Sequence, residues 1–248
     1  MYIDILARKI ISRLFLATAS PLLTGRSDDP LPIYPAGVGL ALFDGATNCT
    51  FPAPAPYFDS SKFVGPNPSA PAVWYQIAAS QQPFEAGCTC MYAKYALPAS
   101  SSSSSSPAPS SSFQVENFCT RNGTVQSSVH GVALSTAPRY GSGTFQIQIE
   151  HAHQPPGGRC GAESPNLVVV KAYEEDEEIG GKGEKRYATV ILGERNFDGF
   201  YLLSRERDWP RTKVNTYLKD VASLGFNLSQ PYSLADQGPH CPEPEAAI

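Results

Sequence analysis

The chain has 248 residues, of which 42% are apolar and 17% are charged, and its formal net charge is −4. The charged fraction lies below the ~25% of typical soluble domains, and no basic patch longer than Lys185-Arg186 offers a surface for nucleic acid. No run approaches the roughly 18 apolar residues that a membrane-spanning helix needs. Composition therefore argues against a nucleic-acid partner and an integral membrane span, and leaves enough apolar side chains for one core.

The first part of the chain is predicted to contribute little regular structure. Residues 1–25 are a candidate signal peptide, because a basic segment precedes a short apolar run and Ala17-Thr18-Ala19 offers a small-residue cleavage site. Residues 26–70 form a proline-rich leader in which no helical or strand period survives. We expect this leader to be mostly irregular, with Cys49 as the residue that would fix it to the rest of the protein.

Eight strand-like segments follow, rich in β-branched and aromatic residues and separated by turn signals. A helical period appears only after the eighth, through Val214, Leu218 and Val221, and it stops at Gly225. The pattern predicts an all-β fold, an eight-stranded antiparallel up-and-down β-barrel with one C-terminal α-helix packed outside, although a two-sheet sandwich has the same strand count. The expected strands are 73–79, 89–97, 113–119, 125–135, 144–150, 167–173, 187–192 and 199–204.

Two biased segments interrupt this series, and a short tail ends it. Residues 98–112 are a serine-rich insertion between the second and third strands, tolerated because loop-closure entropy rises slowly with length. The acidic run 174–178 is followed by Lys182, Lys185 and Arg186 beyond a glycine pair. It predicts a solvated hairpin tip with cross-strand charge pairs, the alternative being a calcium site. Residues 242–248 form the tail.

The cysteines and sequons favour an extracellular protein. Six cysteines make an even count, and the C-x-C of Cys88 and Cys90 matches neither a redox pair nor a zinc knuckle. Three disulfides are therefore favoured over a metal cluster. Three N-x-[ST] triplets make Asn48, Asn122 and Asn227 candidate glycosylation sites. Together with the N-terminal segment, these features predict a secreted glycoprotein.

Residues that could support catalysis or metal binding are sparse. His151 and His153 would share one face of a strand, but a metal would need a third ligand. A cysteine nucleophile would need a free thiol and a base, and no nucleophile elbow, phosphate-binding loop or paired-carboxylate spacing occurs. We therefore predict no metal, no cofactor and no catalytic residue.

Three short motifs, in order along the chain, resemble those of the lipocalin family. The family opens with G-x-W-Y-x-I-A and continues with a cysteine followed by A-x-Y-x-L. The last motif here is similar to the Y-L-W-I-L-S-R strand before the helix in the apolipoprotein D and bacterial lipocalin branch. The resemblance identifies residues 71–241 as a lipocalin-like barrel. The matching segments are Ala72–Ala78 with Cys90 and Ala93–Leu97, then Gln114–Cys119 with Gly131–Ala133, then Phe200–Arg205.

The resemblance implies structural roles for two matched residues. It places Trp74, one of two tryptophans, at the floor of the barrel where the first strand begins. Arg205 ends the last strand, and the first and last strands are neighbours in a closed barrel. We therefore predict that the Arg205 guanidinium stacks on the Trp74 indole and closes the barrel.

The resemblance also implies a function, that of a secreted binding protein that carries or sequesters a small hydrophobic ligand such as a lipid, sterol, retinoid or pigment in the barrel. The alternatives are a lipocalin-like enzyme that acts on such a molecule and a secreted interaction protein with a filled barrel. The oligomeric state is left open. Because strand side chains alternate between faces, the predicted lining is Gln76, Ala78, Met91, Ala93, Tyr95, Phe113, Val115, Asn117, Phe145, Ile147, Ile149, Tyr201 and Leu203.

The same branch implies one of the fifteen disulfide connectivities open to six cysteines. It ties the second strand to the C-terminal tail, which here gives Cys90–Cys241. Hairpin pairing through the serine-rich insertion brings Cys88 or Cys90 near Cys119, so Cys88–Cys119 follows, with a local bulge to aim the side chains. The remaining pair, Cys49–Cys160, would join the leader to the loop after the fifth strand.

Overall fold

The computed structural model describes a barrel and the segments packed against it. The described residues are 33–36, 39–44, 48–81, 85–98, 112–121, 124–137, 139–150, 160–161, 164–179 and 182–244. The predictions that lie outside them concern the candidate signal peptide (1–25), most of the serine-rich insertion (99–111), Asn122, His151 and His153.

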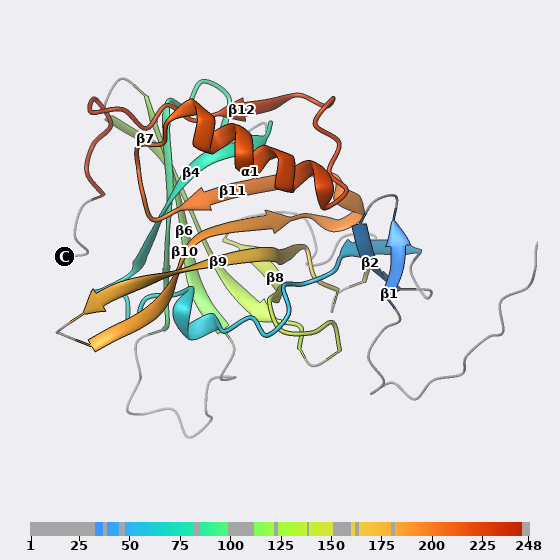
Figure 1. The fold of residues 1–248 in the computed structure, drawn as a ribbon. Coiled ribbons are helices and arrows are strands. Elements are labelled where there is room, and N and C mark those ends of the chain that lie inside the picture. The colour runs from blue at the N-terminus through green and yellow to red at the C-terminus, as the bar shows by residue number, and fades with distance from the viewer. Residues whose placement is uncertain are drawn as a thin grey trace, which may run out of the picture.

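Strands β4 to β11 form one closed antiparallel sheet (Figure 1). Each strand pairs with the next, and β11 pairs back onto β4, where Ser204 lies opposite Tyr75. The closed ring confirms the predicted barrel and excludes the two-sheet sandwich. The strands are β4 (Ala72–Ser80), β5 (Cys90–Ala96), β6 (Ser112–Arg121), β7 (Thr124–Ser135), β8 (Thr144–Ile149), β9 (Leu167–Ile179), β10 (Lys182–Gly193) and β11 (Phe200–Ser204).

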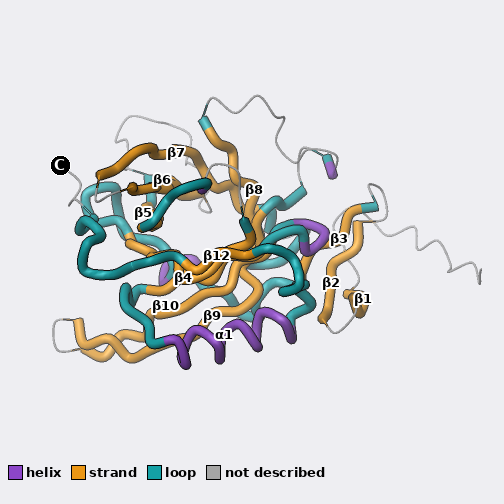
Figure 2. The backbone as a smooth tube through the Cα atoms, turned by 90° about the horizontal axis from the view of Figure 1, so that it is seen from above, coloured by secondary structure: helices purple, strands orange, loops and turns teal. Residues whose placement is uncertain are grey.

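Helix α1 (Arg211–Ser223) lies outside the barrel, as predicted (Figure 2). Val214, Leu218 and Val221 recur at helical spacing, and all three are buried. They belong to a helix-side core that also contains Val170 of β9 and other outward-facing side chains of the barrel. The helix ends before Gly225, whose φ of 99° suits glycine and closes the last turn.

A ninth strand, β12 (Tyr232–Leu234), joins the sheet after the helix. It pairs with the end of β4 that extends beyond the β4–β5 register, so that Leu234 lies opposite Ala78. The chain then places Gln237 between β4 and β5, where its amide donates hydrogen bonds to the carbonyls of Gln76 and Met91. The C-terminal segment thus seals the gap between the first two strands of the barrel.

The structure differs from the sequence-based interpretation of residues 26–70. The described part of this leader contains a three-stranded antiparallel sheet of β1 (Ile33–Ala36), β2 (Gly39–Asp44) and β3 (Cys49–Pro52). These strands are only 4–6 residues long, but Phe51 of β3 is fully buried in the helix-side core. Buried aromatic residues therefore attach the leader to the barrel.

The rest of the leader closes one end of the barrel. The short 3-10 helix η1 (Ser60–Lys62) precedes Phe63, which is fully buried. The ring of Phe63 contacts those of Trp74 and Tyr95, with centroids 5.2 Å and 5.1 Å apart. Seven rings form a continuous set of aromatic contacts, which we call the floor cluster: Phe58, Phe63, Trp74, Tyr95, Phe113, Phe145 and Tyr187.

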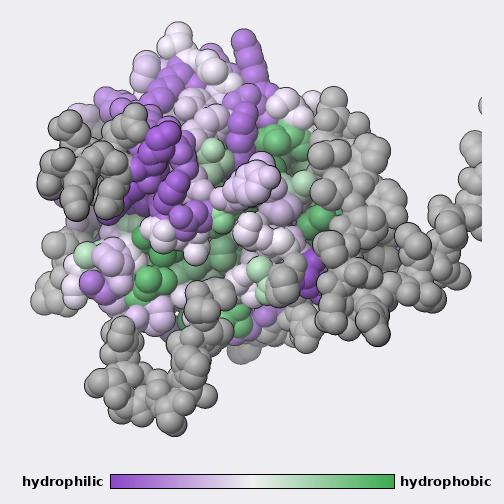
Figure 3. Space-filling view, turned by 60° about the horizontal axis from the view of Figure 1, so that its bottom comes forward, coloured by the Kyte–Doolittle hydropathy of each residue, from purple (hydrophilic) through white to green (hydrophobic). Residues whose placement is uncertain are grey.

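The acidic run lies on the hairpin of β9 and β10, as predicted. Lys185 pairs with Asp176 and Arg186 pairs with Glu175 in the backbone register. Figure 3 shows that hydrophilic side chains cover much of the face that it views, with a smaller hydrophobic area beside them. Opposite charges therefore face each other at these two positions of the register, which agrees with a solvated hairpin.

All three disulfides join the pairs of cysteines that we predicted. Cys90–Cys241 joins β5 to the C-terminal segment, and Cys49–Cys160 joins the leader to the loop after β8. Cys88–Cys119 joins the segment before β5 to β6. The expected bulge between β5 and β6 is not found, because their register runs without a shift from Cys90 opposite Thr120 to Ala96 opposite Gln114. The register shift next to Cys119 lies between β6 and β7. No cysteine remains free.

Candidate ligand-binding site

A cavity of about 550 Å³ lies inside the barrel above the floor cluster. Its volume falls in the range of known small-molecule sites, roughly 300–1,000 Å³. The alternation of strand side chains brings eleven of the thirteen residues predicted from the sequence to its wall. They are Gln76, Met91, Ala93, Tyr95, Phe113, Val115, Asn117, Ile147, Ile149, Tyr201 and Leu203.

Two predicted lining residues lie elsewhere. The register between β4 and β11 shifts, because Leu203 lies opposite Gln76 and Leu202 opposite Ala78. Ile77 is therefore an extra residue on β4, and Ala78 lies in the helix-side core with it. The inward assignment of Ala78 is thus corrected by this bulge. Phe145 does face inward, but it belongs to the floor cluster, with its ring 5.0 Å from that of Phe113.

The open end of the cavity carries polar residues that the sequence patterns did not indicate. Glu85 comes from the segment between β4 and β5, and Glu194, Arg195 and Asp198 come from the β10–β11 turn. This turn contains the short 3-10 helix η4 (Arg195–Phe197). None of these residues lies in a strand, so no alternation of faces could have assigned them to the interior.

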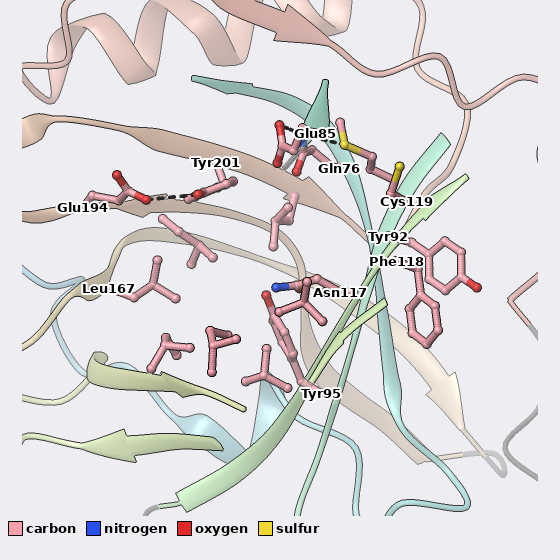
Figure 4. A pocket seen from close by; sticks show the side chains of 18 of the residues that line it. Gln76, Glu85, Tyr92, Tyr95, Asn117, Phe118, Cys119, Leu167, Glu194 and Tyr201 are labelled. Atoms are coloured by element: carbon pink, nitrogen blue, oxygen red, sulfur yellow. Dashed lines mark hydrogen bonds between the residues drawn. The ribbon is translucent and has the colours of Figure 1, made fainter. Parts of the chain in front are cut away.

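Hydrogen bonds connect this polar end to the strands (Figure 4). Gln76 Nε2 donates to Glu85 Oε2 at 3.3 Å and also lies 3.6 Å from Met91 Sδ. The Tyr201 hydroxyl donates to Glu194 Oε1 at 3.0 Å. The cavity wall thus has an apolar body and a polar end with two carboxylates, which suits an amphiphilic molecule.

Burial changes the acidity of these groups. It raises the pKa of Glu85 to about 7, an effect that the hydrogen bond from Gln76 opposes and the nearby Glu194 charge reinforces. Burial also raises the pKa of Tyr201 well above its usual value, with the Glu194 carboxylate acting in the same direction. Burial alone raises the pKa of Tyr95 in the floor cluster as well. Both phenols therefore remain neutral donors at physiological pH.

Glu85 is expected to make the protein less stable as the pH rises. Its pKa is about 7 in the folded protein and close to 4.5 in an unfolded chain, so folding favours the protonated form. Its contribution to stability is complete below about pH 4.5 and is lost as the pH rises through 7, on the order of 3 kcal/mol. Urea denaturation at pH 5 and pH 8 should show this fall in wild type and a smaller fall in Glu85→Gln.

The control for this experiment is Glu175→Gln, the same change on β9. Glu175 is exposed, does not line the cavity and forms no ion pair with a described residue. This variant should keep the wild-type difference between pH 5 and pH 8. An equal pH dependence in Glu85→Gln and wild type would contradict the assignment of the fall to Glu85.

The predicted stacking at the closed end is present. The Arg205 guanidinium carbon lies 3.9 Å from the centroid of the Trp74 ring. Arg205 also donates to the carbonyls of Val73 at 3.1 Å and Phe63 at 3.2 Å, and Trp74 Nε1 donates to Phe63 at 2.9 Å. One cation thus connects β11, β4 and the leader, and both residues have structural roles.

Within the described residues, one group of histidine, cysteine and acidic side chains is compact enough to consider as a metal site. It consists of Cys90, His240 and Cys241. Both sulfur atoms belong to the Cys90–Cys241 disulfide and cannot act as thiolate ligands.

None of the described helices is both long and apolar enough to cross a membrane.

No protein-family model and no curated protein matches the chain. Among solved structures, lobster apocrustacyanin A1 is 15% identical, with a TM-score of 0.43 over 74% of this chain and 82% of that chain. Insecticyanin from the tobacco hornworm is 15% identical, with a TM-score of 0.37 over 79% and 86%. The siderocalin Ex-FABP is 12% identical, with a TM-score of 0.37 over 74% and 100%. These neighbours are lipocalins.

Proposed function

We propose that the chain is a secreted lipocalin of the apolipoprotein D and bacterial lipocalin branch, which carries or sequesters a small hydrophobic ligand such as a lipid, sterol, retinoid or pigment. The observation that carries this proposal is the cavity of about 550 Å³, lined by apolar strand side chains above an aromatic floor. Burying the apolar surface of a ligand there is favourable by roughly 25 cal/mol per Å² before the costs of association.

The two alternative functions have less support. All six cysteines are in disulfides, so a barrel enzyme with a cysteine nucleophile would lack its thiolate. An interaction protein with a filled barrel would have side chains where this barrel has its cavity. A binding protein accounts for both observations.

Secretion is supported by the same disulfides, because such bonds form and persist in oxidising compartments. Two of the three sequons have exposed asparagines, Asn48 and Asn227. Their exposure supports the proposal that both carry glycans. Mass spectrometry of the protein secreted by a eukaryotic host, before and after removal of N-glycans, should show a mass loss that Asn227→Gln and Asn48→Gln each reduce. An unchanged mass would contradict glycosylation.

Ligand binding is tested by titration with N-phenyl-1-naphthylamine, an uncharged probe that fluoresces in apolar sites. We expect saturable binding with a micromolar dissociation constant. Asn117→Trp should weaken it at least ~tenfold, about 1.4 kcal/mol. Asn117 lines the cavity, and its side chain makes no hydrogen bond to any described residue, so the larger ring removes space without breaking a contact.

The matched control is Gln114→Trp, on the same strand β6 but with an exposed side chain outside this cavity. It should leave the dissociation constant of the probe unchanged. Equal binding by wild type and Asn117→Trp would place the site outside the barrel, and a complete lack of binding by wild type would overturn the proposed function.

A further inference from the structure

The charges on the cavity wall are unbalanced. The described residues that line it include three carboxylates, Glu85, Glu194 and Asp198, and one cation, Arg195. All four lie at the open end, in the segments that connect β4 to β5 and β10 to β11. A ligand with a carboxylate head group, such as a fatty acid, would therefore meet a net negative wall.

Glu85 is the carboxylate of this group with the most unused capacity to accept hydrogen bonds. Glu85 is only 9% exposed, and the one hydrogen bond that its carboxylate accepts from a described residue comes from Gln76 Nε2 at 3.3 Å. A carboxylate can accept about four hydrogen bonds. A buried carboxylate is costly unless a cation or several donors compensate it, and no cationic side chain of the described residues forms an ion pair with Glu85.

Glu194 lies on the other side of Tyr201 from Glu85 (Figure 4). The Tyr201 hydroxyl donates its hydrogen bond to Glu194. Tyr201 therefore does not supply a hydrogen-bond donor to Glu85. Both carboxylates line the same end of the cavity, so their like charges disfavour each other. A single cation between them would stabilise both charges at once.

A second polar position lies deeper in the cavity. Tyr95 is 6% exposed, and its hydroxyl has no hydrogen-bond partner among the described residues. Figure 4 shows that it points into the cavity towards the amide of Asn117. A phenol hydroxyl can donate and accept a hydrogen bond, and an amide can do both as well, so these two side chains favour a ligand with a polar atom along its apolar body.

We propose that the cavity selects an amphiphilic amine. The protonated amine lies between the carboxylates of Glu85 and Glu194, the apolar body lies along the strand side chains, and a hydroxyl or carbonyl group of the ligand reaches Tyr95 and Asn117. This assignment rests on the proposed ligand-carrying function and adds the chemical class of the ligand.

The test is a competition between three head groups on the same chain. Dodecylamine, dodecanol and dodecanoic acid, each below its critical micelle concentration, displace bound N-phenyl-1-naphthylamine at pH 7.5. We expect the amine to displace half of the probe at a concentration about tenfold or more below that of the acid, with the alcohol between them. Dodecanoic acid at least as effective as the amine would overturn the assignment.

Variants connect the selectivity to the two carboxylates. Glu85→Gln and Glu194→Gln should each lower the acid-to-amine ratio of half-displacing concentrations several-fold, and the double variant should bring it close to one. The ratio cancels any change in affinity for the probe itself. Glu116→Gln, which changes net charge equally on the outer face of β6, should keep the wild-type ratio. A ratio retained in the double variant would also overturn the assignment.

The outcomes separate this inference from the function on which it rests. If wild type binds the probe but shows no preference for the amine, the carrier function stands and the assignment of an amine ligand fails. If wild type binds no probe, the carrier function fails and the amine assignment fails with it.

Discussion

Trp74→Ala is expected to lower the free energy of unfolding by about 3–5 kcal/mol. The indole is fully buried, stacks on the Arg205 guanidinium and donates a hydrogen bond to the Phe63 carbonyl. Its removal leaves a void in the floor cluster. The Arg205 guanidinium loses its stacking partner, and the Phe63 carbonyl loses one hydrogen-bond donor. Denaturant unfolding followed by far-UV circular dichroism measures the loss.

Trp209→Ala is the matched control, because Trp209 is the other tryptophan of the chain. It is partly exposed and packs on Tyr217 of helix α1, with ring centroids 4.7 Å apart. We expect a loss less than half that of Trp74→Ala, since less apolar surface is re-exposed. A loss within about 0.5 kcal/mol for Trp74→Ala would contradict the assigned role of the floor cluster.

Removal of the Cys49–Cys160 disulfide, by Cys49→Ala with Cys160→Ala, is expected to cost about 4–5 kcal/mol. The bond spans 111 residues, so it removes much of the conformational entropy of the unfolded chain. It also fixes β3 to the loop after β8, beside the buried Phe51. Guanidinium unfolding of the double variant measures the loss, and limited proteolysis should show earlier cleavage in the leader.

The comparison for this disulfide is Cys88–Cys119, which spans only 31 residues. Chain entropy predicts a loss of about 3.5 kcal/mol for its removal, roughly 1 kcal/mol less than for the longer connection. If removal of Cys49–Cys160 costs less than removal of Cys88–Cys119, the leader is not fixed to the barrel in the way described.

The barrel could be predicted from the sequence because its signals are local. Segments such as Thr144–Ile149 alternate apolar and polar residues, and Val214, Leu218 and Val221 show the helical period directly. Strand β12 and strands β1 to β3 could not be found in this way. They are only 3–6 residues long. Strand β12 pairs with β4 of the barrel, and β1 to β3 pair with one another in a separate sheet, so their pairing depends on tertiary structure.

The candidate site was predictable only along the strands. Alternation places Met91, Ala93 and Tyr95 on one face, but it fails at Ala78 because a bulge shifts the register by one residue. Glu85 and Glu194 have no sequence signal, since loops have no period and only the closed barrel brings the two loops together. The charged end of the cavity is therefore a tertiary feature.

Methyl NMR with a titrated ligand tests most directly whether the barrel interior binds hydrophobic molecules. Val115, Ile147 and Leu203 line the cavity, whereas Leu218 and Val221 lie under helix α1 on the outer face. With N-phenyl-1-naphthylamine, we predict saturable shifts at the three cavity methyl groups, at one ligand per chain, and little change at the two outer ones. Shifts at the helix-side methyl groups with unchanged cavity resonances would contradict a ligand site inside the barrel.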